Sequence, residues 1–209
     1  MLAVIGMGYV GLPLAVALAK ENHVVGFDID KIRINYLKKS IDQTGEISKN
    51  EIINSKKIKF SDKISDLSKC ETYIITVPTP IDSDNNPNLK PLLNATKTIS
   101  KVLSKNNLVI YESTVFPGAT EELCGPILEK NSGFKINKNL YLGYSPERIN
   151  PGDKNRKLTD IIKIVSGSNK KAQDRVSRLY SSIIKAGIYR AESIKIAEAA
   201  KVIENTQRD

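Results

Sequence analysis

The chain has 209 residues, of which 40% are hydrophobic, 26% are charged and 6% are aromatic. This length and composition suit one large α/β domain with a buried core, and they exclude a disordered chain. The net charge is +9 at pH 7, but the lysines are scattered and form no long basic block. We therefore expect a solvated basic surface and no nucleic-acid partner.

The cysteine and hydropathy patterns exclude several kinds of site. Cys70 and Cys124 lack CxxC spacing, and His23 is the single histidine, so the sequence predicts no metal site and no disulfide framework. The apolar start is too short for a signal peptide, and no run reaches the length of a membrane span. We expect a cytoplasmic protein without a membrane partner.

Short apolar runs alternate with longer amphipathic stretches along the chain. In chain order, strands are predicted at residues 2–5, 23–28, 72–77, 108–112, 141–144, 161–165 and 187–190. Helices are predicted at residues 10–20, in the thirties, after Ser48, at 89–103, after Pro117, at 172–184 and from Ser193 onward. This alternation predicts an α/β fold with a Rossmann-like, doubly wound, mostly parallel sheet and helices on both faces.

Two local features refine this pattern. Ser48 and Glu51 have the spacing of a capping box, which predicts the start of the short helix there. The last helix carries apolar residues between Ile194 and Ile203, and no glycine cap or proline follows before Asp209, so we expect a truncated helix that belongs to a longer protein.

A glycine-rich loop follows the first predicted strand and opens the first helix. Gly6 permits a tight turn, Gly8 lets the backbone approach a pyrophosphate, and Gly11 lets helix and strand pack closely. The helix N-terminus then offers N–H groups to the phosphates. Asp28 ends the second predicted strand. A carboxylate there can accept hydrogen bonds from the ribose hydroxyls of NAD, and it would repel the 2′-phosphate of NADP. The pattern favours NAD over NADP, although FAD-binding proteins share the fingerprint. The predicted cofactor contacts here are Gly6, Gly8, Tyr9, Val10, Gly11 and Asp28.

Five ordered segments carry a resemblance to a known family. They are residues 6–15, 77–80, 112–120, 145–152 and 200–206. Together they resemble the UDP-glucose/GDP-mannose dehydrogenase family over nearly the whole chain. The version Ser-Pro-Glu-Arg-Ile-Asn-Pro-Gly-Asp at residues 145–153 resembles the branch that acts on UDP-N-acetylhexosamines, whereas UDP-glucose enzymes typically carry Pro-Glu-Phe-Leu there.

The resemblance implies an NAD-dependent oxidoreductase that converts a sugar CH2OH to a carboxylate with two NAD+. It implies an NAD-binding, Rossmann-like domain at residues 1–190 and the start of a central helix at 191–209 that packs in a homodimer. It also implies that the catalytic cysteine and the C-terminal UDP-sugar-binding half lie outside these residues. We therefore expect Cys70 and Cys124 to be small buried apolar residues, and the chain to be inactive alone.

The resemblance also assigns roles to residues. Thr114 matches the position that holds a catalytic water, Glu147 the base that activates water, Lys201 the cation that steadies an oxyanion, and Asn205 the amide that assists it. Lys201 and Asn205 are four residues apart and thus share one helix face. The implied further cofactor contacts are Val77, Pro78, Thr79, Ser113 and Thr114. The implied UDP-N-acetylhexosamine contacts are Glu147, Arg148, Ile149, Asn150, Lys201 and Asn205.

Other functions are compatible with the same front half. These are a UDP-glucose 6-dehydrogenase, a dehydrogenase of the 6-phosphogluconate or hydroxyacyl type, and a non-catalytic NAD-binding module. The loop at residues 145–153 differs from the Pro-Glu-Phe-Leu that is typical of UDP-glucose enzymes. That loop and the pair of Lys201 and Asn205 speak against the 6-phosphogluconate and hydroxyacyl types, and the open-ended last helix speaks against the non-catalytic module.

Overall fold

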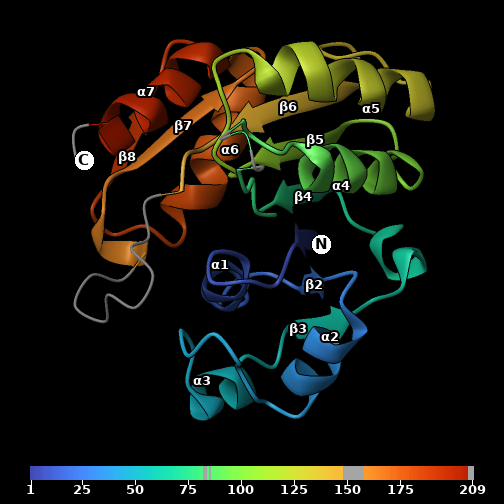
Figure 1. The fold of residues 1–209 in the computed structure, drawn as a ribbon, viewed down its shortest axis with the longest axis vertical. Helices are drawn as coiled ribbons and strands as arrows, with labels where there is room; N and C mark the ends of the chain where they lie inside the picture. Colours follow the sequence, from blue (N-terminus) through green and yellow to red (C-terminus); the bar gives the residue numbers. More distant parts are fainter. Residues whose placement is uncertain (82–83, 85, 148–157, 207–209) are drawn as a thin grey trace.

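The computed structural model describes residues 1–81, 84, 86–147 and 158–206, with Asn205 described by its backbone alone. Within these residues, one eight-stranded sheet has the order β3-β2-β1-β4-β5-β6-β7-β8 (Figure 1). The strands are β1 (Leu2–Ile5), β2 (Val24–Phe27), β3 (Ile58–Ser61), β4 (Thr72–Ile75), β5 (Asn107–Tyr111), β6 (Leu140–Tyr144), β7 (Lys163–Gly167) and β8 (Ile188–Arg190).

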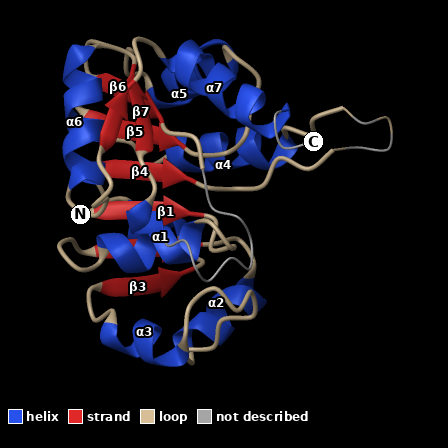
Figure 2. Cartoon of the chain, turned by 90° about the vertical axis from the view of Figure 1, so that its left-hand side faces the viewer, coloured by secondary structure: helices blue, strands red, loops and turns tan. Residues whose placement is uncertain are grey.

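Helices cover both faces of this sheet (Figure 2). They are α1 (Gly11–Leu18), α2 (Lys31–Lys38), α3 (Lys49–Asn54), α4 (Lys90–Ser100), α5 (Gly125–Ser132), α6 (Lys170–Ser181) and α7 (Ile194–Thr206). Shorter helical segments are η1 (Ile64–Leu67), η2 (Ala119–Cys124) and η3 (Leu158–Asp160). In the part of the chain that the structure describes, no helix combines the length and apolar character needed to span a bilayer.

Two hydrophobic cores lie on opposite faces of the sheet. Along β1, Leu2 and Val4 belong to the core beneath α1, α2, α3 and α6, whereas Ala3 and Ile5 belong to the core beneath α4, α5 and α7. This follows from strand geometry, since successive side chains point to opposite faces. Because both faces are covered, the central strands are apolar throughout, as the sequence predicts for a doubly wound sheet.

The strand order identifies the place where ligands bind in doubly wound sheets, which is at the carboxyl ends of the strands. β1 pairs in parallel with β2 on one side and with β4 on the other, so the chain order reverses at β1. The connections that follow β1 and β4 therefore leave in opposite directions, and in such sheets a crevice lies outside the carboxyl ends at this switch point. β7 runs antiparallel to β6, whereas the other neighbouring strands pair in parallel, so the sheet is mostly parallel. The predicted fold class is confirmed.

Several elements differ from the sequence prediction, and three of them matter here. The edge strand β3 was not predicted, because Ile58 and Phe60 are only partly buried and its pairing with β2 decides its conformation. The helix after Pro117 begins as the π-helical segment η2, directly after Gly118 at a φ of +100°. β7 lies two residues further along than the predicted strand at 161–165. By contrast, the capping box of Ser48 and Glu51 is confirmed at the start of α3.

One face of α7 is buried on the sheet. Ile194 and Ala197 join the core, and the fully buried carboxylate of Glu198 accepts hydrogen bonds from the backbone N–H groups of Gly118 at 2.5 Å and Thr120 at 2.9 Å. These two bonds tie α7 to the segment that follows β5. The opposite face exposes apolar side chains, namely Ile196, Val202 and Ile203.

Candidate functional site

A cleft of about 780 Å³ lies at the carboxyl ends of β1, β2, β4 and β5. It gathers segments that are far apart in sequence, as the topology of the sheet requires. The predicted site residues that line it are Gly6, Gly8, Tyr9, Val10, Asp28, Val77, Pro78, Thr79, Ser113, Thr114 and Glu147. These residues follow five different strands, namely β1, β2, β4, β5 and β6, so the fold brings them together from distant parts of the chain.

The glycine loop has the backbone that its sequence predicts. Gly6 lies at a φ of +97°, a region that side chains disfavour. A Cβ on Gly11 would lie 1.8 Å from the carbonyl oxygen of Gly6, so glycine is required for the helix to pack there. Gly11 lies behind the loop and not in the cleft lining. A Cβ on Gly8 would meet nothing within 4 Å, which leaves space beside the backbone for a phosphate.

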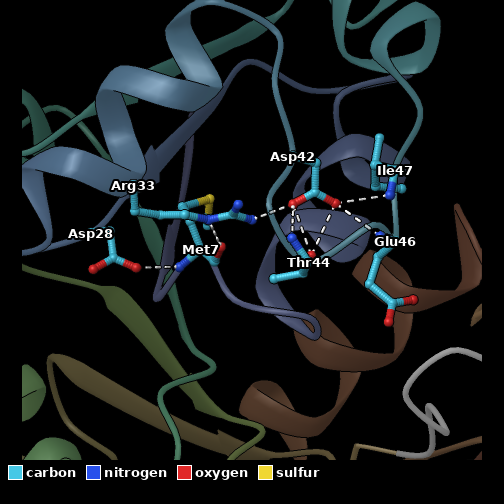
Figure 3. A network of polar contacts seen from close by, with 7 residues as sticks. All are labelled: Met7, Asp28, Arg33, Asp42, Thr44, Glu46 and Ile47. Atoms are coloured by element: carbon cyan, nitrogen blue, oxygen red, sulfur yellow. Dashed lines mark hydrogen bonds and ion pairs between the residues drawn. The ribbon is translucent and has the colours of Figure 1, made fainter.

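Asp28 holds the glycine loop from the end of β2. Its Oδ2 accepts a hydrogen bond from the backbone N–H of Met7 at 2.7 Å (Figure 3). Its Oδ1 accepts one from the N–H of Asp30 at 2.9 Å. A carboxylate has about four lone-pair sites, so it keeps capacity for ribose hydroxyls. The acid expected about 20 residues after the loop thus lies against it.

Sequence reasoning missed a second charged side chain at this end of the cleft. Arg33 lines the cleft from α2, and its Nε donates a hydrogen bond to the carbonyl oxygen of Met7 at 2.7 Å. Together, Asp28 and Arg33 bind both the N–H and the C=O of Met7, the residue between two loop glycines. The available signal was an arginine one helical turn into the helix after Asp28, which no local pattern marks as buried.

At the other end of the cleft, hydroxyl groups tie the ends of β4 and β5 together. The Thr79 hydroxyl donates to the carbonyl oxygen of Thr114 at 2.7 Å. The Ser113 hydroxyl donates to the carbonyl oxygen of Val77 at 2.6 Å. These bonds fix the two segments that were predicted to contact the cofactor, and they bring Thr114 to the cleft wall.

Glu147 and Lys201 meet beside this end of the cleft. Glu147 lines the cleft, and the Lys201 Nζ lies 3.5 Å from its Oε2. The two residues are only 8% and 5% exposed. Burial, followed by the negative charge of Glu147, raises the pKa of the lining residue Tyr9, so its phenol stays protonated.

Four predicted substrate contacts fall where no side chain is described. Arg148, Ile149 and Asn150 lie outside the described residues, and Asn205 belongs to α7 by its backbone. The roles assigned to these residues, and those of Glu147, Lys201 and Thr114, stay predictions.

A buried charge cluster behind the cleft was also missed. The Lys163 Nζ donates to the Oε2 of Glu112 at 2.7 Å and to the carbonyl oxygen of Pro146 at 3.1 Å. The Tyr180 hydroxyl donates to the other oxygen of Glu112. Because Glu112 lines the cleft and Pro146 precedes Glu147, this cluster fixes two segments of the cleft wall.

Both cysteines are poor nucleophiles in this structure. Burial raises the pKa of Cys70 to about 11 and also raises the pKa of Cys124. Cys70 precedes β4 at its amino end, and neither residue lines the cleft. At neutral pH both are therefore buried thiols, as the sequence predicts.

Comparison with known proteins decides the family. Residues 1–184 match the model of the UDP-glucose/GDP-mannose dehydrogenase family, NAD binding domain. The chain belongs to this family.

Relatives of known name lie in the same family. The chain is 54% identical to UDP-N-acetyl-D-glucosamine 6-dehydrogenase of Pseudomonas aeruginosa over 207 residues, which cover 99% of the chain and 49% of the relative. It is 51% identical to protein CapL of Staphylococcus aureus over 208 residues, which cover 100% and 49%. The chain thus spans about half the length of the curated relatives it matches.

Solved structures agree on the fold. UDP-D-ManNAc dehydrogenase of Pyrococcus horikoshii superposes with a TM-score of 0.92 at 34% identity, over 99% of the chain and 50% of that structure. GDP-mannose dehydrogenase of Pseudomonas aeruginosa superposes with a TM-score of 0.87 over 99% of the chain and 49% of that structure; at 20% identity, it bears on the fold alone.

The residues of the cleft fit the NAD of this family. The glycine loop leaves open space beside Gly8, and Asp28 lies against the loop, where its carboxylate would accept hydrogen bonds from the ribose hydroxyls of NAD. NAD is therefore the cofactor of this domain.

Proposed function

We propose that the chain is the cofactor-binding part of an NAD-dependent UDP-N-acetylhexosamine 6-dehydrogenase, which oxidises the sugar CH2OH to a carboxylate with two NAD+. The observation that carries this proposal is the approach of Lys201 to Glu147, which lines the NAD cleft together with Thr114. The names of the P. aeruginosa and Salmonella typhi relatives, at 54% and 53% identity, support the N-acetylhexosamine branch.

The charges at this end suit an alcohol oxidation. NAD+, when bound, accepts a hydride from the sugar carbon. The protein must therefore supply a group that takes the hydroxyl proton and a group that stabilises the negative charge that develops on oxygen. Lys201 supplies a buried cation for an oxyanion, and its attraction to Glu147 holds it at the cleft. Glu147 supplies a carboxylate that takes a proton from the water molecule whose addition yields the carboxylate product. Thr114 lines the same cleft as Glu147.

The finer parts of the proposal concern assembly and location. The apolar side chains of Ile196, Val202 and Ile203 on the outer face of α7 support a homodimer formed through this helix. We place the reaction in the cytoplasm, where nucleotide-activated sugars are substrates for biosynthesis. Within the family, UDP-glucose is the alternative substrate, and the sequence at residues 145–153 favours the N-acetylhexosamine.

A chimera tests the proposed reaction. Residues 1–209 would replace the matching half of the P. aeruginosa relative, and NADH formation from NAD+ and UDP-N-acetylglucosamine would be followed by absorbance. We expect turnover by the chimera, and a loss of at least about 100-fold in kcat for Lys201→Met and for Glu147→Gln. Lys195→Met, on the exposed face of the same helix, is the matched control and should keep full activity. A folded chimera that binds NAD+ and yields no NADH would contradict the proposal.

A further inference from the structure

A buried ion pair joins the glycine loop to the segment after α2. The Arg33 Nη2 donates to the Oδ1 of Asp42 at 2.7 Å, while the Arg33 Nε holds the carbonyl oxygen of Met7 (Figure 3). The side chains of Arg33 and Asp42 are 9% and 1% exposed. Charges so far from water persist only with partners, so each fixes the other in place.

Asp42 is saturated by hydrogen bonds. Its carboxylate accepts from the backbone N–H groups of Thr44 at 3.0 Å, Glu46 at 2.9 Å and Ile47 at 3.0 Å, and from the Thr44 hydroxyl at 2.8 Å. Burial alone would raise the pKa of Asp42, but the bonds from Ile47, Thr44 and Arg33 outweigh it, and the pKa is lowered. Asp42 therefore stays charged at neutral pH and neutralises Arg33.

This pair stands at the ribose end of the NAD cleft. Arg33 and Thr44 line that end together with Asp28 and Asp30, and Arg33 contributes the one guanidinium among the described lining residues. Its Nη1 is buried and has no hydrogen-bond partner within the described part of the chain. An arginine at this place is the group that accommodates the 2′-phosphate of NADP in dinucleotide-binding folds. Arg33 is thus the right kind of group for NADP but is already engaged.

We propose that Asp42 is a specificity-determining residue that keeps the cleft selective for NAD by occupying Arg33. With Arg33 neutralised, Asp28 and Asp30 leave the ribose end negatively charged, and this charge repels the added phosphate of NADP. Asp42 acts through Arg33 and does not itself line the cleft, so it is a positioning residue.

The test is the ratio of the NADP+ and NAD+ dissociation constants, measured by calorimetric titration of the 209-residue chain. Asp42→Asn removes the charge that holds Arg33 and should lower this ratio about sevenfold, the effect of one unit charge on a doubly charged phosphate at roughly 7 Å in water. NAD+ affinity should change less than threefold. The double variant Arg33→Met/Asp42→Asn should lose the gain in NADP+ binding.

Asp30→Asn is the matched control. It removes one carboxylate from the same end of the cleft, and asparagine still caps α2 in place of Asp30. If the charge alone matters, Asp30→Asn will equal Asp42→Asn, and the inference is overturned. If release of Arg33 matters, Asp30→Asn will lower the ratio clearly less than Asp42→Asn does.

Two further outcomes are decisive. An unchanged ratio in a folded Asp42→Asn overturns the inference and leaves the NAD site standing; if circular dichroism shows that this variant is unfolded, Asp42→Ser takes its place in the same comparison. Failure of the unaltered chain to bind either dinucleotide overturns the cofactor assignment and the inference together. The inference depends on the NAD site and not on the proposed sugar oxidation, so inactivity of the chimera leaves it untouched.

Discussion

The buried cluster behind the cleft gives a sharp stability prediction. Lys163→Met leaves the carboxylate of Glu112 buried without its cation, since the two side chains are 2% and 1% exposed. Breaking a buried ion pair by removing one partner costs about 3–5 kcal/mol, because the remaining charge is uncompensated. Of a total stability of roughly 5–15 kcal/mol, this is a large share. The Pro146 carbonyl also loses its donor.

Urea unfolding measures this cost. With an m-value of roughly 2 kcal/mol/M, the midpoint should fall by about 2 M in Lys163→Met. The double variant Glu112→Gln/Lys163→Met removes both charges and keeps an acceptor for the Tyr180 hydroxyl, so it should recover at least about 2 kcal/mol. A control pair at the surface, Lys59 with Asp66, should give less than about 1 kcal/mol for Lys59→Met. A loss below about 1 kcal/mol in Lys163→Met, or an equal loss in the single and double variants, would refute the reasoning.

Three further predictions concern the loop, the thiols and acid stability. Gly8→Ala should keep its stability within about 0.5 kcal/mol yet weaken NAD+ binding about tenfold in calorimetry, whereas Gly11→Ala should lose at least about 2 kcal/mol in urea unfolding. Cys70 and Cys124 should resist alkylation at pH 8 until denaturant is added, since burial raises both thiol pKa values; rapid labelling in native buffer would contradict this. Because the folded pKa of Asp42 is lowered, its stabilisation is present above the ordinary pKa of about 3.9 and lost as pH falls through the folded pKa. The stability gap between the unaltered chain and Asp42→Asn should therefore shrink in urea titrations below about pH 4.

Local patterns predicted the parts of the site that the backbone builds. The glycine loop requires a positive φ at Gly6 and close packing at Gly11, and only glycine meets both needs. Such requirements are written in a few consecutive residues, so the strand, the loop and the helix could be placed. Asp28 could be placed because the βαβ unit fixes the distance to the end of the second strand.

Side-chain pairs across the fold could not be predicted in the same way. Lys163 and Glu112 are 51 residues apart, and their contact depends on β7 lying against β6. Arg33 and Asp42 lie in a polar stretch of sequence that is typical of an exposed surface, and only the folded chain shows that their side chains are buried. The edge strand β3 likewise owes its conformation to pairing with β2.

The measurement that tests the account most directly is the number of NADH molecules formed per sugar by the chimera. With UDP-N-acetylglucosamine limiting and NAD+ in excess, the account predicts two NADH per sugar consumed and a carboxylated sugar nucleotide as product. UDP-glucose should react more slowly. One NADH per sugar with an aldehyde product, or NADH formation that survives Lys201→Met and Glu147→Gln, would contradict the assignment of these residues to an oxidation that proceeds to the acid.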